Sequence, residues 1–301
     1  MASPIEVILI PALMILLGFF LKQKSILDDN AREILTKIVL YIALPSMIFI
    51  NLKDAYISQQ MLFLPILGII VSVILCIIAY IYCRMRNHSK KTAWTIMIAS
   101  SLMNTGFIGF PVSLGVFGNE GFLNALFFDL STSIMLVIYG VILAKEFGGD
   151  RREVIRNTIT FIPLWAVIFG LIFNVFNIPL FYVAETIIDY FGQATIPMIM
   201  LAIGLSLDYG SIKDYLADSI VVSIFKLALA PAIMLILVSL LNIKGMAFNI
   251  AILEAGMSTA GNSLVLAVQY NLDEDLMSSL IFTTVVLSVF TLTVIISLLA
   301  G

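Results

Sequence analysis

The chain has 301 residues, 61% of them hydrophobic and 12% charged, with a formal net charge of −3. Soluble domains carry about 25% charged residues, so this composition excludes an ordinary soluble protein. Apolar stretches of about 18 to 25 residues, long enough to cross a bilayer, recur along the whole sequence. We expect the lipid bilayer as a partner and no nucleic acid.

These stretches predict an all-α polytopic membrane protein with ten transmembrane helices. In chain order the expected spans are 4–21, 34–52, 60–83, 93–117, 122–144, 158–178, 182–207, 217–241, 246–270 and 276–300. The seventh is the weakest pattern, because Glu185 and Asp189 lie near its start. The hydrophilic stretch 145–157 is expected to connect two halves of the chain, and His88 to be a solvated loop residue.

Two of the expected spans contain residues that an uninterrupted helix disfavours. In span 4, Gly106 and Gly109 lower helix propensity, and Pro111 removes a backbone donor. A similar break is expected in span 9, at 256–262. Freed backbone groups survive at membrane depth only inside protein or along a polar cavity, and broken helices of this kind are typical of secondary transporters.

A shift of 152 residues superimposes the two halves of the sequence. It pairs Pro11 with Pro163, Pro45 with Pro197 and Gly109 with Gly261, and it places spans 1–5 on spans 6–10. Because five spans is an odd number, the halves must have opposite orientations. The sequence therefore predicts two inverted five-helix repeats, residues 1–149 and 150–301, with the broken helices 4 and 9 at equivalent places.

The basic residues predict an orientation. With the N-terminus outside, thirteen Lys and Arg residues fall in cytoplasmic loops, and only Lys53 and Lys244 fall outside. The thirteen are Lys22, Lys24, Arg32, Lys37, Arg84, Arg86, Lys90, Lys91, Lys145, Arg151, Arg152, Arg156 and Lys213. The positive-inside rule then places both termini on the extracytoplasmic side of the cell membrane.

Several motifs resemble those of the auxin efflux carrier family, which includes plant auxin exporters and bacterial malate permease-like proteins. They are Asn104-x-Gly-x-x-Gly-x-Pro111, Ala255-Gly-Met-Ser-Thr-Ala260, Asn262-Ser-Leu-Val-Leu-Ala267 and Thr283-Thr-Val-Val-Leu-Ser288. The resemblance implies a bile-acid-sodium-symporter-like fold in which helices 4 and 9 cross. It also implies a transport domain (about 60–146 and 214–301), a scaffold domain (about 1–55 and 157–210), a homodimer through the scaffold, and transport of organic anions.

The two breaks supply the candidate substrate site. The free N–H groups of half-helices suit a carboxylate, the amides of two asparagines can serve an anion or a cation, and unwound carbonyls near Gly106 and Gly256 could face a cation. The alternative is that small residues only let helices pack closely. The candidate substrate-binding residues are Asn104, Thr105, Gly106, Gly109, Pro111, Met257, Ser258, Thr259, Gly261 and Asn262.

Ionisable residues inside the expected spans are candidates for ion coupling. Glu254 could bind Na+, as in the Glu-x-Gly-Met motif of bile acid sodium symporters that it resembles, could carry H+, or could make a structural hydrogen bond. Asp129, with Ser131, Thr132 and Ser133, offers a similar group of oxygens unless it lies near the outer interface. Lys226 could snorkel, pair with a carboxylate or attract an anionic substrate.

Together these features predict a secondary active transporter of small organic anions that works by alternating access. The expected substrates are carboxylates such as malate, or auxin-like monocarboxylates, with Na+ or H+ as a coupling ion and no other cofactor. An anion channel or an uncoupled uniporter on the same fold is the alternative. An enzyme is not expected, because no His-Glu-x-x-His, Gly-x-Ser-x-Gly or Gly-x-Gly-Asp motif occurs.

Overall fold

The structure is a computed structural model and describes residues 4–206 and 214–299. Within these ranges it contains helices and one isolated β-bridge but no strand, which confirms the prediction of an all-α protein. The α-helices are α1 (Pro4–Gln23), α2 (Asp29–Ile38), α3 (Leu44–Leu52), α4 (Leu64–Arg86), α5 (Lys90–Ser101), α6 (Phe110–Phe147), α7 (Arg151–Ile159), α8 (Ile162–Val175), α9 (Tyr182–Ser206), α10 (Leu216–Ile224), α11 (Ala230–Leu240), α12 (Gly245–Ala255), α13 (Asn262–Gln269) and α14 (Glu274–Leu299). The shorter helices are η1 (Val39–Ala43), η2 (Gln59–Phe63), η3 (Thr105–Gly109) and η4 (Phe225–Leu229).

Six helical stretches of the described chain are long and apolar enough to cross a membrane. They are Asn30–Leu52, Gln59–Arg86, Thr105–Phe147, Tyr182–Ser206, Leu216–Leu240 and Glu274–Leu299. Shorter apolar helices are Leu9–Gln23, Ile162–Val175 and Gly245–Ala255. The chain is therefore a multi-pass membrane protein, whereas the count of ten spans and their inverted repeat stay predictions.

The stretch α6 covers the region expected to hold the end of span 4 and all of span 5. Two helices join within it at a kink that falls between the expected bounds 117 and 122. Gly118 makes this kink with φ 66° and ψ −160°, a conformation that glycine adopts readily. The hydrophilic connector, residues 145–157, is partly helical, because α7 begins inside it at Arg151 and ends just beyond it at Ile159.

Three of the short helices in the described chain, η1, η3 and η4, are π-helices, and each ends just before an X-Pro pair. The proline explains why the turn before it is wider than an α-helical turn. A proline ring clashes with the carbonyl four residues earlier, and the proline itself has no N–H to donate. In η1, η3 and η4 the residue before the proline donates its N–H five residues back: Leu44 to Val39, Phe110 to Thr105, and Ala230 to Phe225. The prolines Pro45, Pro111 and Pro231 thus set where the α-helical register changes.

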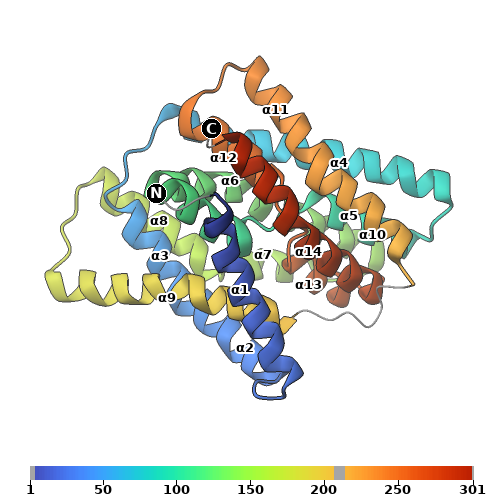
Figure 1. Cartoon of the computed structure of the whole chain (residues 1–301), viewed down its shortest axis with the longest axis horizontal. Coiled ribbons are helices and arrows are strands. Elements are labelled where there is room, and N and C mark those ends of the chain that lie inside the picture. Colours follow the sequence, from blue (N-terminus) through green and yellow to red (C-terminus); the bar gives the residue numbers. More distant parts are fainter. Residues whose placement is uncertain (1–3, 207–213, 300–301) are drawn as a thin grey trace. The chain divides into compact units, whose positions relative to one another are not determined.

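The chain divides into two compact units, and each is described by itself. Unit 1 contains Gln59–Val154 and the described residues of Met1–Ile8 and Asp208–Gly301. Unit 2 contains Leu9–Ser58 and the described residues of Ile155–Leu207. In unit 1, α4 packs against α5 and α6, α11 against α12, and α10 against α14. In unit 2, α3 packs against α8 and α9 (Figure 1).

Two contacts stabilise unit 2. The side-chain amide of Asn174 in α8 donates to the carbonyls of Leu52, Lys53 and Ala55, which satisfies acceptors at the end of α3. The backbones of α1 and α9 also touch, because a Cβ added to Gly204 would lie only 2.0 Å from the carbonyl oxygen of Ile15. Small residues allow this close approach between apolar helices.

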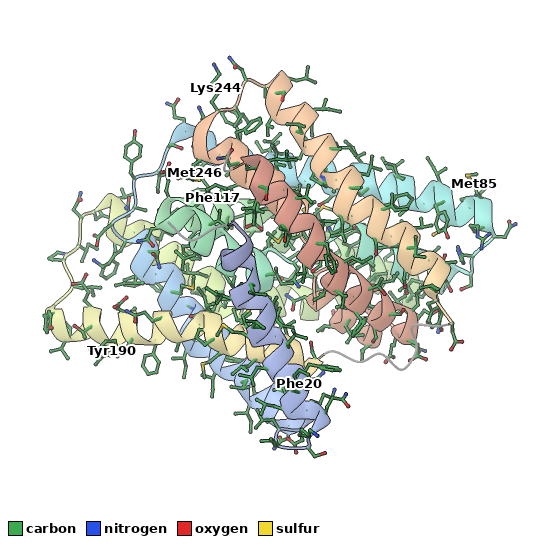
Figure 2. The ribbon with its side chains drawn as sticks, viewed as in Figure 1. Phe20, Met85, Phe117, Tyr190, Lys244 and Met246 are labelled. Atoms are coloured by element: carbon green, nitrogen blue, oxygen red, sulfur yellow. The ribbon has the colours of Figure 1, made fainter. Side chains whose placement is uncertain are left out.

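Large apolar side chains cover the outer faces of both units. Phe20 is 58% exposed, Met85 is 77% exposed and Tyr190 is 68% exposed, and all three point away from the ribbon in Figure 2. On α4 the exposed side chains include Ile66, Ile70, Val73, Ile77, Tyr80 and Ile81. Such wide apolar surfaces are unfavourable in water and are expected where lipid tails cover a protein.

The expectation for His88 was wrong. Instead of being solvated, its side chain is half-buried, and its Nε2 lies 3.3 Å from Oδ1 of Asp218, which also accepts a hydrogen bond from the Tyr82 hydroxyl at 2.6 Å. The residue therefore belongs to a polar contact between the end of α4 and the start of α10.

The contact between α1 and α9 predicts a difference between two glycine substitutions. Gly204→Ala should lower the free energy of unfolding by about 1–3 kcal/mol, because the new methyl group meets backbone that cannot move aside. Gly261→Ala, where an added Cβ meets nothing within 4 Å, should leave stability unchanged or slightly raised. Melting of the detergent-solubilised variants measures this, and equal melting temperatures would contradict the close contact.

Candidate functional site

Two apolar helices of unit 1 are interrupted, one at 256–262 as the sequence indicates and one just before the Gly106–Pro111 motif. The first is α5, which ends at Ser101 and is followed by extended backbone at Leu102 (φ −81°, ψ 127°) before η3 begins at Thr105. The second is α12, which ends at Ala255, and the chain becomes helical again in α13 at Asn262. Both predicted breaks are therefore present.

The two interruptions meet and form hydrogen bonds with each other. Met103 and Thr259 form an antiparallel β-bridge. Within it the Asn104 N–H donates to the Ser258 carbonyl at 2.9 Å, and the Ala260 N–H donates to the Leu102 carbonyl at 3.2 Å. The backbone groups freed by one break are thus partly satisfied by the other, as burial away from water requires. We call residues 102–104 and 256–261 the crossing.

Side chains from neighbouring helices support the crossing. The Thr259 N–H donates to the Thr284 hydroxyl of α14 at 3.1 Å, and the Thr259 hydroxyl donates to the Ala99 carbonyl of α5 at 2.9 Å. The Asn104 amide nitrogen lies 3.5 Å from the Ser258 hydroxyl. Met257, Ser258 and Thr259 are completely buried, so these predicted substrate residues hold the crossing together rather than offering side chains to solvent.

One side of the crossing is open in unit 1. Asn262 is exposed, Gly106 and Gly261 are half-buried, and a Cβ added to Gly261 would meet nothing within 4 Å. The first N–H groups of a helix have no partner within that helix, so the start of η3 and the N–H of Asn262 offer backbone donors here, whereas Ser263 and Leu264 already donate to Ala260 and Gly261. Two helix N-terminal ends and two C-terminal ends meet at the crossing, which gives it both positive and negative partial charges.

A first carboxylate lies beside the start of η3. Asp129 of α6 accepts a hydrogen bond from the Thr105 hydroxyl, and the Ser133 hydroxyl lies 3.5 Å from its other oxygen. Thr132 joins this cluster, with 3.4 Å between its hydroxyl and that of Thr105. Ser131 does not: its hydroxyl donates to the Phe128 carbonyl at 2.6 Å and faces Gly68 of α4.

A second carboxylate lies beside the end of η3. Glu254 of α12 is completely buried, and its Oε1 accepts a hydrogen bond from the Ser113 hydroxyl at 2.7 Å. A Cβ added to Gly109 would lie 2.0 Å from Oε2 of Glu254, so only glycine fits at that position. Within the described residues Oε2 has no hydrogen-bond partner, and no group of three or more His, Cys, Asp or Glu side chains forms a metal site.

Lys226 has a different environment from the one expected. It lies in η4, is 0% exposed, and its Nζ has no hydrogen-bond partner among the residues that the structure describes. Of the three expected fates of this side chain, snorkelling and pairing with a carboxylate are not observed, and attraction of an anionic substrate stays a prediction. The segment packs against α5 and α14, both of which support the crossing.

The extended backbone does not coincide with the glycines that predicted it. Gly106 and Gly109 lie inside η3, and Pro111 lies in the first turn of α6, so the break precedes this motif. The expectation of unwound carbonyls near Gly106 was therefore wrong, because a π-helix accommodates Pro111 without unwinding the segment. Gly256 does end its helix, α12.

The structure adds site residues that the sequence alone did not single out. They are Ser113, which bonds Glu254, and Thr284, which accepts from the crossing. Ser113 could have been found from its position two residues after Pro111. Thr284 belongs to one of the motifs quoted above, but only the fold shows that it contacts the crossing.

The support given by Thr284 predicts a contrast between two neighbouring threonines. Thr284→Val should lower stability by about 1–3 kcal/mol, because the buried Thr259 N–H loses its acceptor. Thr283→Val should be nearly neutral, because the Thr283 hydroxyl is buried without a partner in the described structure. Thermal unfolding of both variants measures the contrast. Equal losses would show that the hydroxyl of Thr284 does not support the crossing.

Comparison with known proteins agrees with this architecture. A family described as membrane transport protein matches residues 5–296. An uncharacterized transporter of Methanothermobacter thermautotrophicus is 34% identical over 289 residues, which are 95% of each chain. An uncharacterized transporter of Methanocaldococcus jannaschii is 35% identical over 294 residues, again 95% of each chain.

A more distant relative has a name that includes a substrate. It is a protein of Rhizobium meliloti named "Putative malonate transporter", 25% identical over 296 residues, with 93% of this chain and 91% of the relative covered. The family match spans nearly the whole chain, and the two archaeal relatives align along almost their full length. The chain therefore belongs to the membrane transport protein family, the auxin efflux carrier family that its motifs resemble.

Proposed function

We propose that the protein is a secondary transporter of small carboxylates, with dicarboxylates such as malonate and malate as the first candidates. The observation that carries this proposal is the crossing, where the Met103–Thr259 bridge brings four helix ends together beside two asparagine amides. Discontinuous helices whose N-terminal ends face an anionic group are a recurring way to bind substrates at membrane depth. The relative from Rhizobium meliloti supports malonate as the first anion to test.

The proposed anion site is the open side of the crossing. One carboxylate of the bound anion would accept hydrogen bonds from the N–H groups at the starts of η3 and α13, and from the side chains of Asn104 and Asn262. The second carboxylate of a dicarboxylate would need further hydrogen-bond donors. The side-chain amide of each asparagine has two N–H donors, so Asn104 and Asn262 can supply one each. These contacts replace hydration that the anion loses in the site.

We assign the moving part of the transport cycle to unit 1, because the crossing lies wholly within it. In this assignment unit 1 is the transport domain and unit 2 is the scaffold. Alternating access would expose the open side of the crossing first on one face of the membrane and then on the other. The orientation proposed from the basic residues places both termini outside the cell membrane, and the family resemblance supports a homodimer through the scaffold.

An asparagine substitution tests the site. Asn104→Ala or Asn262→Ala should weaken malonate binding about tenfold to a hundredfold, because a hydrogen bond to a charged group contributes about 1.5–3 kcal/mol. Counterflow of radiolabelled malonate in proteoliposomes, with malate as a second substrate, measures the effect. Asn124→Ala is the matched control, because the Asn124 amide donates to the Glu120 carbonyl within α6.

The same assay separates the alternatives. Counterflow requires a carrier that returns loaded, so a channel would show flux without counterflow, together with unitary currents. Absence of malonate and malate counterflow in the wild-type protein would contradict the proposed substrate class. Full activity of both asparagine variants would move the anion site away from the crossing.

A further inference from the structure

The short helix η3 lies between two carboxyl groups, that of Asp129 from α6 beyond its kink and that of Glu254 from α12. Asp129 contacts the start of η3 through the Thr105 hydroxyl, and Oδ1 of Asp129 is the atom nearest to a Cβ added at Gly106, at 3.7 Å. Glu254 contacts the end of η3 at Gly109. We propose that Asp129 and Glu254 form a proton-binding pair whose protonation is required for tight anion binding at η3, which makes the carrier a proton–carboxylate symporter. This inference rests on the proposed function.

The hydrogen bonds of Glu254 favour its neutral form. An ionised carboxylate removed from water needs several donors, and within the described residues Glu254 receives one, from Ser113. Its other oxygen faces the Cα of Gly109. Asp129 lies against the same short segment, η3, as Glu254, so charging both groups at once is unfavourable. A proton on Glu254 removes both costs, and the proton that links the pair to the substrate is taken up at Asp129, which bonds Thr105 at the start of η3.

The space at Glu254 favours a proton over a larger cation. Calcium-like hard cations require six or more oxygen ligands, each about 2.3–2.6 Å from the ion, and Na+ likewise needs a shell of oxygens. In the observed position of the Glu254 side chain, Oε2 lies directly against Gly109, since an added Cβ would lie 2.0 Å away. A proton needs no such space.

The position of Asp129 links this proton to the substrate. Asp129 bonds Thr105, the first residue of η3, and the start of η3 is also where the anion would bind. Ionised Asp129 occupies the positive helix end and repels a second negative charge, whereas neutral Asp129 leaves that end free. A like charge at about 7 Å in a partly buried site weakens binding about tenfold to a hundredfold.

Symport also reduces the charge that crosses the membrane. Moving one negative charge inward against an inside-negative potential costs about 2.3 kcal/mol per 100 mV, and each accompanying proton removes one such charge. A carrier that binds its anion tightly only after protonation cannot readily carry the anion alone. The pair therefore enforces coupling at the binding step.

No other titratable side chain is observed in contact with the pair within the described residues. The elements packed against α12 and η3 are α4, α6, α11 and α14, and of these α11 has no titratable residue. Besides Asp129 their titratable residues are Cys76, Tyr80, Tyr82, Cys83, Arg84 and Arg86 on α4, Glu120, Tyr139, Lys145 and Glu146 on α6, and Glu274 and Asp275 on α14. Lys226 forms no ion pair with either carboxyl group.

Malonate binding to the purified full-length protein tests the inference, over a pH range in which malonate stays a dianion. Wild-type affinity should fall about tenfold or more as the pH rises through this range, because the pair loses its proton. Titration calorimetry in buffers of different ionisation enthalpy should show proton uptake with each malonate bound. Asp129→Asn and Glu254→Gln together should keep tight binding at every pH and abolish the proton uptake.

The control is Glu120→Gln, an exposed carboxylate on the same helix, which should behave like the wild type. Binding of wild-type protein that is independent of pH would overturn the inference, and so would a pH dependence that survives in the double variant. A requirement for sodium without proton uptake would overturn it in favour of Na+. Absence of carboxylate binding at any pH would instead overturn the proposed function, and the inference with it.

Discussion

A helix that is interrupted at membrane depth has backbone groups that neither water nor lipid can satisfy, and this constraint shapes the whole of unit 1. Two interruptions solve it together, because each supplies hydrogen-bonding groups for the other through the bridge between Met103 and Thr259. The hydroxyl of Thr284 and the carbonyl of Ala99 satisfy further groups of Thr259. Because each break depends on the other, the crossing forms only when both half-helices are in place.

The same arrangement explains why polar and charged side chains gather in an otherwise apolar unit. Helix ends that meet at the crossing have partial charges, and Asp129 and Glu254 lie against the segment that begins there. Gly109 lets the carboxyl group of Glu254 come close to the backbone of η3. In the proposed cycle the substrate and the proton would act on this one short segment, which is the simplest physical route to coupling between them.

The sequence predicted the helical class, the two breaks and most of the residues around them, because Gly106, Gly109 and Pro111 have strong local preferences. It placed the extended backbone a few residues too late, since a π-helix absorbs Pro111 and the break falls at Leu102–Asn104. Local preference also could not show that Ser131 faces α4, that Lys226 is fully buried, or that Ser113 bonds Glu254. Those facts depend on which helices pack together.

The central claim is that a carboxylate binds on the open side of the crossing. A cryo-electron microscopy map of the protein with saturating malonate, compared with a map without ligand, tests this most directly. Added density is expected between the start of η3 at Thr105 and Gly106 and the start of α13 at Gly261 and Asn262. Density confined to another part of the protein, with the crossing unchanged, would contradict it.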